Sequence, residues 1–115
     1  MNYIDQLDTY LLEDYFTNLG KAIVEQMLDL YIKQSAIYLN EINQTIEDES
    51  QSSWEGKCHK MKGAAGSIGL VKVHAKLVAI EKSTDNWEVN KRYFDELCNI
   101  NQISIESFSQ WLLEK

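Results

Sequence analysis

The chain has 115 residues, a length typical of one domain, and it contains five glycines and no proline. Because sheet-rich folds need many tight turns built from these two residues, this composition favours long helices and few loops. The net charge of −7 argues against nucleic acid as a partner, and no apolar run is long enough to span a membrane.

Two helical patterns occupy the first part of the chain. A short helix is predicted over residues 8–17 and a long one from Lys21 to about Glu47, where apolar residues recur at steps of three and four. The short helix should have Leu11, Leu12, Tyr15 and Phe16 on its apolar side. The long helix should bury Val24, Leu28, Tyr31, Ser35, Tyr38 and Ile42, and Ile23, Met27, Leu30 and Ile37 should widen this face.

A third helix is predicted to follow the loop EDESQS. Ser52 and Glu55 match the S-x-x-E capping box, which satisfies free amides at a helix start, so we expect the helix to begin there. Gly69 is the expected terminator. The residues predicted to face the core are Cys58, Met61, Ala65 and Ile68.

Two further helices complete the pattern. We expect one over about 70–84 and another over about 87–113, separated by the polar turn STDN. The segment NINQIS within the last helix is a weak helix former and predicts a bend or a break. The expected inward residues are Leu70, Val73, Leu77 and Ile80, then Phe94, Leu97, Phe108 and Leu112. The fold predicted for the single domain, 1–115, is all-α: an antiparallel four-helix bundle with a short N-terminal accessory helix.

The stretch CHKMKGAAGSIGL holds one of only two histidines together with three of the five glycines. With about 100° per residue, His59 points well away from the core stripe of its helix, and Lys62, Gly63 and Gly66 surround it. Small residues also let helices pack closely, which explains the inward-facing Ala65. It does not explain Gly63, which faces solvent on this projection and weakens the helix there. The pattern indicates a reactive imidazole that has a cation beside it and, because of the glycines, open space for a partner to approach.

Other kinds of site have weak support in the sequence. No phosphate-binding glycine loop is present, and Glu55 with His59 would form only half of a metal site. Cys58 and Cys98 fit no zinc spacing and are expected to be reduced thiols. His74 is expected at the surface. The tryptophans expected in the core or at its rim are Trp54, Trp87 and Trp111.

The run HKMKGAAGSIGL resembles the signature of histidine phosphotransfer (HPt) domains, roughly H-x-hydrophobic-K-G-small-small-x-x-hydrophobic-G. It is especially similar to the run in the C-terminal domain of a hybrid sensor kinase. The matching residues are His59, Met61, Lys62, Gly63, Ala64, Ala65, Ile68 and Gly69. The resemblance also extends to the length, the acidity and the helical layout of the whole chain.

This resemblance implies a phosphocarrier and not an enzyme with its own nucleotide site. His59 would accept a phosphoryl group from an aspartate on the receiver domain of a hybrid sensor kinase and pass it to a response regulator receiver domain. Lys62 would neutralise the transferring oxygens, and Gly63 would let the receiver close over the ring. Glu81, 22 positions after the histidine, would bond the ring nitrogen that is not phosphorylated. No cofactor is expected on this chain, since Mg²⁺ would belong to the partner receiver.

Two alternatives stay open from the sequence: a helical adaptor that binds a partner without chemistry, and the substrate segment of a histidine kinase. Met1 suggests a free-standing protein, although a piece of a larger kinase would look the same. The N-terminal MNYIDQLDTY has no cationic region and no apolar signal core, so we expect a cytoplasmic monomer.

Overall fold

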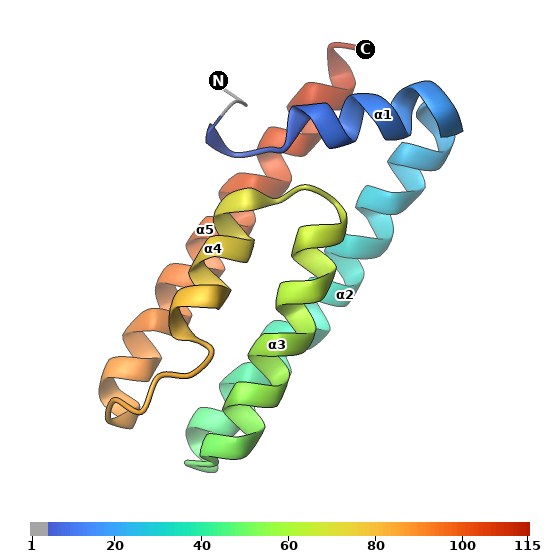
Figure 1. Ribbon diagram of the computed structural model, residues 1–115. Coiled ribbons are helices and arrows are strands. Elements are labelled where there is room, and N and C mark those ends of the chain that lie inside the picture. The colour runs from blue at the N-terminus through green and yellow to red at the C-terminus, as the bar shows by residue number, and fades with distance from the viewer. Residues whose placement is uncertain (1–4) are drawn as a thin grey trace.

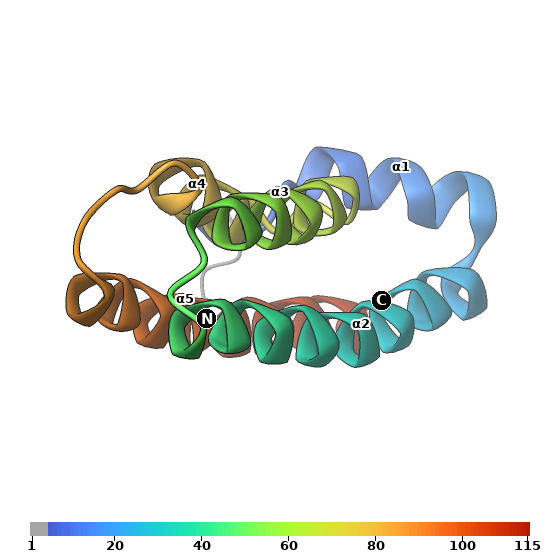
Figure 2. The same cartoon turned by 90° about the horizontal axis from the view of Figure 1, so that it is seen from below.

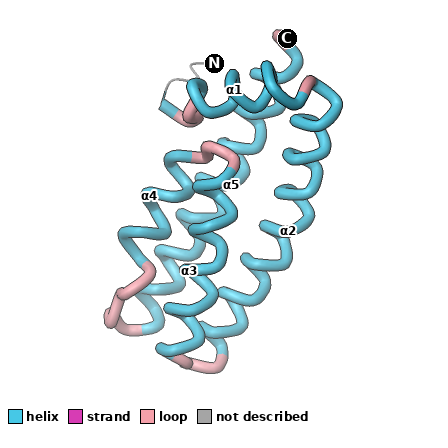
Figure 3. Tube along the Cα trace, turned by 45° about the vertical axis from the view of Figure 1, so that its right-hand side comes forward, coloured by secondary structure: helices cyan, strands magenta, loops and turns pink. Residues whose placement is uncertain are grey.

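The computed structural model describes residues 5–115, and within them it contains five helices and no strand. Their bounds are α1 Thr9–Leu19, α2 Lys21–Glu47, α3 Gln51–Ser67, α4 Val71–Ile80 and α5 Trp87–Leu113. Helices α2 to α5 form the bundle and α1 lies across one end of it (Figure 1), with short loops between them (Figure 3). The predicted all-α bundle with an accessory helix is therefore confirmed. Met1, on which the expectation of a free-standing protein depended, lies outside the described residues.

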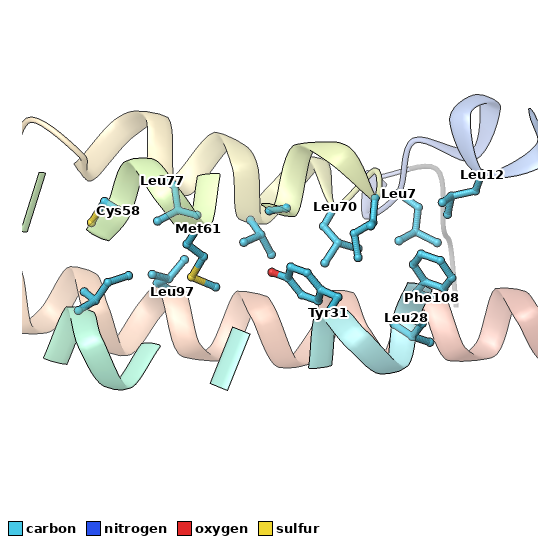
Figure 4. Close-up of a cluster of buried hydrophobic side chains, with 14 of the residues drawn as sticks. Leu7, Leu12, Leu28, Tyr31, Cys58, Met61, Leu70, Leu77, Leu97 and Phe108 are labelled. Carbon is cyan, nitrogen blue, oxygen red and sulfur yellow. The ribbon is translucent and has the colours of Figure 1, made fainter. Parts of the chain in front are cut away.

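The bundle has two layers, with α3 and α4 packed over α2 and α5 (Figure 2). Side chains from both layers meet between them: Leu97 faces Met61 and Leu77 of the other layer, and the Tyr31 ring extends along the space between the layers (Figure 4). The residues predicted to face inward from the third and fourth helices are all buried: Cys58, Met61, Ala65, Ile68, Leu70, Val73, Leu77 and Ile80. None of the helices in residues 5–115 is both long and apolar enough to cross a membrane.

The buried face of α2 is narrower than predicted. Ile23, Leu30 and Ile37, expected to widen it, are 42%, 55% and 59% exposed. Along the bundle α2 packs mainly against α3 and α5, with α1 at one end, and these three side chains on its outer flank stay open to solvent. The prediction for these three residues was wrong, and they form an apolar stripe at seven-residue steps on the surface.

Both ends of α3 can be explained locally. The predicted capping box is absent: the helix begins at Gln51, Ser50 makes no side-chain cap, and Ser52 lies inside the first turn. The chain reverses through Glu49, whose φ of 51° is left-handed, and this starts the helix earlier than expected. At the other end Gly69 adopts φ 74°, and Leu70 N donates to Ala65 O at 3.0 Å. This Schellman arrangement confirms Gly69 as the terminator.

Helix α4 ends at Ile80, four residues before the predicted end. Ser83 N donates to the Ile80 carbonyl at 3.0 Å, and the Ser83 hydroxyl accepts a bond from Asp85 N at 3.2 Å. Polar side chains that bond nearby backbone compete with the helix in this way. The early end leaves Glu81 as the C-cap residue of α4.

Helix α5 runs without interruption through NINQIS, so the predicted bend or break is absent. The buried Asn101 in that segment accepts a hydrogen bond from Tyr31 Oη at 2.7 Å and donates one to Ser35 Oγ at 3.2 Å. Both partners lie on α2. Satisfied buried polar contacts outweigh the low helix propensity of the segment.

Candidate functional site

His59 lies on the outer face of α3, and the opposite face of this helix is buried in the core. Its side chain is 72% exposed, while Cys58 and Met61 next to it are completely buried. The arrangement follows from the helical repeat, because the residues that face the core recur on the side opposite the imidazole. The ring is therefore open to a large partner from the solvent side.

The carboxylate of Glu81 fixes the orientation of this ring. His59 Nδ1 and Glu81 Oε1 are 2.6 Å apart, and the Glu81 side chain is only 7% exposed. Two side chains from the first turn of α3 hold the end of α4 in place. Trp54 Nε1 donates to Ile80 O at 2.9 Å, and Gln51 Nε2 donates to Ser83 O at 2.8 Å. The backbone on each side of Glu81 is thereby tied to the helix that carries the histidine.

Lys62 binds the other oxygen of the same carboxylate. Its Nζ donates to Glu81 Oε2 at 2.8 Å, so one carboxylate joins two side chains of α3. An ionised carboxylate only accepts hydrogen bonds, so the shared proton belongs on His59 Nδ1. In the neutral ring this leaves Nε2 with its lone pair directed away from Glu81.

The surroundings of Glu81 favour its ionised form. Burial opposes ionisation, but the hydrogen bonds from Lys62 and then from His59 outweigh it and hold the pKa of Glu81 below its ordinary value of 4.5. The same carboxylate has an effect on Cys58. Burial and then the nearby Glu81 charge raise the pKa of the Cys58 thiol to about 12. Cys58 and Cys98 form no disulfide in the structure.

Replacing Glu81 with glutamine should change how stability depends on pH. A lowered folded-state pKa means that ionised Glu81 stabilises the protein above about pH 4.5, and that this contribution is lost as the pH falls through the folded-state value. The free energy of unfolding of the wild type should therefore exceed that of Glu81→Gln at pH 7, and the difference should shrink as the pH falls below about 4.5. Urea unfolding at several pH values measures this.

Glu41→Gln provides the matched control. Its carboxylate also pairs with a lysine, Lys57, at 3.0 Å, but both side chains are about a third exposed and screened by solvent. The difference in free energy of unfolding between the wild type and Glu41→Gln should therefore depend less on pH than the difference for Glu81→Gln. Equal pH dependence for the two substitutions would contradict the assigned environment of Glu81.

The glycines around His59 have different surroundings. A Cβ added at Gly63 would meet nothing within 4 Å, as the solvent-facing projection predicted, and the same is true of Gly56. A Cβ at Gly66 would lie 3.1 Å from His74 Cδ2. Gly66 is therefore small because the His74 ring packs against it, and it does not provide open space beside His59. His74 itself is partly buried: it lies at the surface, as expected, with one side of its ring against Gly66 of α3.

A hollow of about 420 Å³ opens beside the imidazole. Its lining consists of Glu55, Gly56, His59, Lys62, Glu81 and Lys82. Helical periodicity alone did not single out Gly56 or Lys82. Gly56 had a usable signal, since it is an exposed helical glycine three residues before the histidine. The sequence predicted Glu55 as part of a capping box and as half of a metal site, and no cluster of three potential metal ligands occurs among residues 5–115.

The comparisons with known proteins agree with this arrangement. Residues 26–105 match the family model described as the Hpt domain. Over 66 residues the chain is 39% identical to the aerobic respiration control sensor protein ArcB of Escherichia coli O157:H7. That match covers 56% of this chain and 8% of ArcB, so this chain corresponds to a small part of its relative's length.

Two solved structures have the same fold. The histidine-containing phosphotransfer domain of ArcB from Escherichia coli superposes with a TM-score of 0.85 at 23% identity, covering 97% of each chain. The solution structure of that domain of the anaerobic sensor kinase gives a TM-score of 0.80 at 24% identity, over 94% of this chain and 88% of the other. At these identities the two structures support the bundle architecture.

Proposed function

Because this chain belongs to the Hpt domain family, the histidine phosphotransfer modules of two-component signalling, we propose that His59 carries the phosphoryl group. The observation that supports this most directly is the pairing of an exposed imidazole with the largely buried carboxylate of Glu81. The carboxylate engages Nδ1 and leaves Nε2 as the accessible nucleophile. We propose a relay in which His59 accepts the group from a hybrid kinase receiver and passes it to a response regulator.

The transfer step needs little chemistry from this chain. The Nε2 lone pair forms the N–P bond as the P–O bond to the receiver aspartate breaks, and the electron pair leaves with the aspartate carboxylate. The Nδ1 proton stays on the ring in its hydrogen bond to Glu81. The receiver supplies the aspartate and Mg²⁺, and the reverse sequence delivers the group to the next receiver. The work of His59 and Glu81 is positioning.

Lys62 has a modified role in this proposal. Its charge is already compensated by Glu81 at 2.8 Å, so it keeps that carboxylate ionised and the ring oriented. An ammonium has three donors, and the two not directed at Glu81 are available to phosphoryl oxygens. Lys62 thus contributes to transfer mainly through Glu81.

The receiver docking surface is best assigned to α2 and α3. The aromatic side chains of α1 are used in packing and are not free for it: Tyr15 Oη donates to Ser67 O at 2.8 Å, and the Phe16 ring packs edge-on against Trp111. In contrast, Leu30 is exposed and lines a shallow hollow of about 150 Å³ that reaches Ala64, the neighbour of Gly63. Apolar surface of this kind beside a reactive group is typical of interface cores.

Removing the apolar side chains of α2 should weaken transfer from a receiver. The double substitution Leu30→Ser and Ile37→Ser should lower kcat/KM for a phosphorylated receiver by about tenfold or more, because each apolar side chain buried on docking stabilises the complex. Labelling by phosphoramidate, a small phosphodonor that needs no docking surface, should not change. Phosphotransfer kinetics with both donors measure the difference.

Ile32→Ser is the control, since Ile32 is an exposed apolar residue on the other flank of α2. It should leave both rates at the wild-type level. A double variant that receives phosphate from the receiver at the wild-type rate would place the docking surface elsewhere.

The proposed function is tested by incubating the protein with a panel of phosphorylated receiver domains. We expect transfer of an acid-labile label to this chain, followed by its loss to a second receiver. A helical adaptor would bind a receiver without becoming labelled. Binding without label for every receiver, together with no label from phosphoramidate, would favour the adaptor and exclude the phosphocarrier.

A further inference from the structure

Some of the charged side chains that line the hollow beside His59 form no ion pair. Lys62 and Glu81 compensate one another at 2.8 Å. Glu55 and Lys82 also line the hollow, and neither side chain forms a hydrogen bond or ion pair with any residue in 5–115. A phosphoryl group on Nε2 would bring about two negative charges into this space, next to the carboxylate of Glu55.

The lysines of α3 are directed to other partners. Lys57 pairs with Glu41 at 3.0 Å, and the Lys60 ammonium lies over the Tyr38 ring, 5.8 Å from its centroid. Both partners belong to α2, on the side of α3 away from Glu81. Lys62 is already paired with Glu81. The ammonium that lines the hollow without a partner among the described residues therefore comes from Lys82.

We propose that Lys82 is a phosphate-contact residue of this site: in addition to the free donors of Lys62, its ammonium binds the oxygens of the phosphoryl group while that group is carried on His59 Nε2. The inference rests on the proposed function of His59. Lys82 directly follows Glu81, whose carboxylate lies 2.6 Å from the imidazole, and its exposed side chain is a flexible four-carbon stem that can reach over the hollow. Lysine binds phosphate as a point charge through charge-assisted hydrogen bonds.

This contact changes no bond in the transfer step. The N–P bond forms and the P–O bond of the donor breaks as before, and Lys82 loses no proton. The charge of Lys82 offsets part of the charge of the dianionic phosphoryl group. The Lys62–Glu81 pair has no net charge and cannot do so. Lys82 therefore acts both on the approach of the phosphodonor and on the phosphorylated state.

The test compares Lys82→Gln with Lys72→Gln, which removes another exposed lysine of the α4 region outside the hollow. With phosphoramidate as donor, Lys82→Gln should be labelled about tenfold more slowly than wild type, the effect of losing one charge-assisted hydrogen bond. Lys82→Arg should restore part of the rate, and Lys72→Gln should equal wild type. Labelling of Lys82→Gln at the wild-type rate would overturn the proposal.

A second measurement separates this proposal from the function of His59. Inorganic phosphate is titrated into the unphosphorylated protein while the His59 ring signals are followed by NMR. Phosphate should shift these signals in wild type and in Lys72→Gln, and clearly less in Lys82→Gln. If no donor labels the wild type but this difference is seen, the phosphocarrier function fails and the Lys82 site stands. Equal shifts in all three proteins would overturn the Lys82 site alone.

Discussion

Replacing His59 with glutamine is expected to abolish labelling by every phosphodonor while leaving the bundle folded. Glutamine has no ring nitrogen to form the N–P bond, yet its amide can still donate to Glu81 Oε1, which His59 Nδ1 now contacts at 2.6 Å. Because the side chain is 72% exposed, the free energy of unfolding should change by no more than about 0.5 kcal/mol. Acid-labile label and urea unfolding, measured on the same preparation, test both statements.

His74→Gln is the control for this substitution, since His74 is the other histidine of the chain. It packs on Gly66 and does not line the hollow, so it should still be labelled at close to the wild-type rate. The stability of His74→Gln should fall more than that of His59→Gln because its ring is half-buried. A His59→Gln protein that still takes label would move the acceptor to His74 or another residue.

The fold was largely predictable because burial in a bundle follows the helical period. The ends of α2 and α5 and the inward stripe of α3 were predicted correctly, since their apolar residues recur without interruption. The pattern failed where a single long-range contact decides the outcome. Asn101 keeps α5 helical through a hydrogen bond to Tyr31, 70 residues earlier in the chain. Helix propensity is a local property and does not report such a distant partner.

The candidate site was only partly predictable. The outward direction of His59 and the open space at Gly63 follow from counting residues along one helix. Glu81 came from the resemblance to the family alone, because the approach of two helix ends depends on how Trp54 holds the Ile80 carbonyl. Lys82 was missed for the same reason. Periodicity describes one helix at a time, whereas the hollow lies between two.

Gly63→Gln is expected to stabilise the fold and to impair transfer. Glycine inside a helix costs about 1 kcal/mol relative to a good helix former, and a Cβ at Gly63 meets nothing within 4 Å. Gly63→Ala and Gly63→Gln should therefore both raise the thermal midpoint. Transfer from a phosphorylated receiver should fall about tenfold or more for glutamine and less for alanine, because the longer side chain stands where the receiver must close, and a loss of this size corresponds to about 1.4 kcal/mol. Labelling by phosphoramidate should change little.

Gly66→Ala provides the contrast, because its Cβ would lie 3.1 Å from the His74 ring and would have to displace it. The gain in helix propensity should be offset there, so its thermal midpoint should not rise as that of Gly63→Ala does. Stability and transfer would then move in opposite directions at Gly63, as expected where access for a partner overrides local propensity. If Gly63→Gln is destabilised, or receives phosphate from the receiver at the wild-type rate, then Gly63 serves helix packing and the receiver approaches His59 from another side.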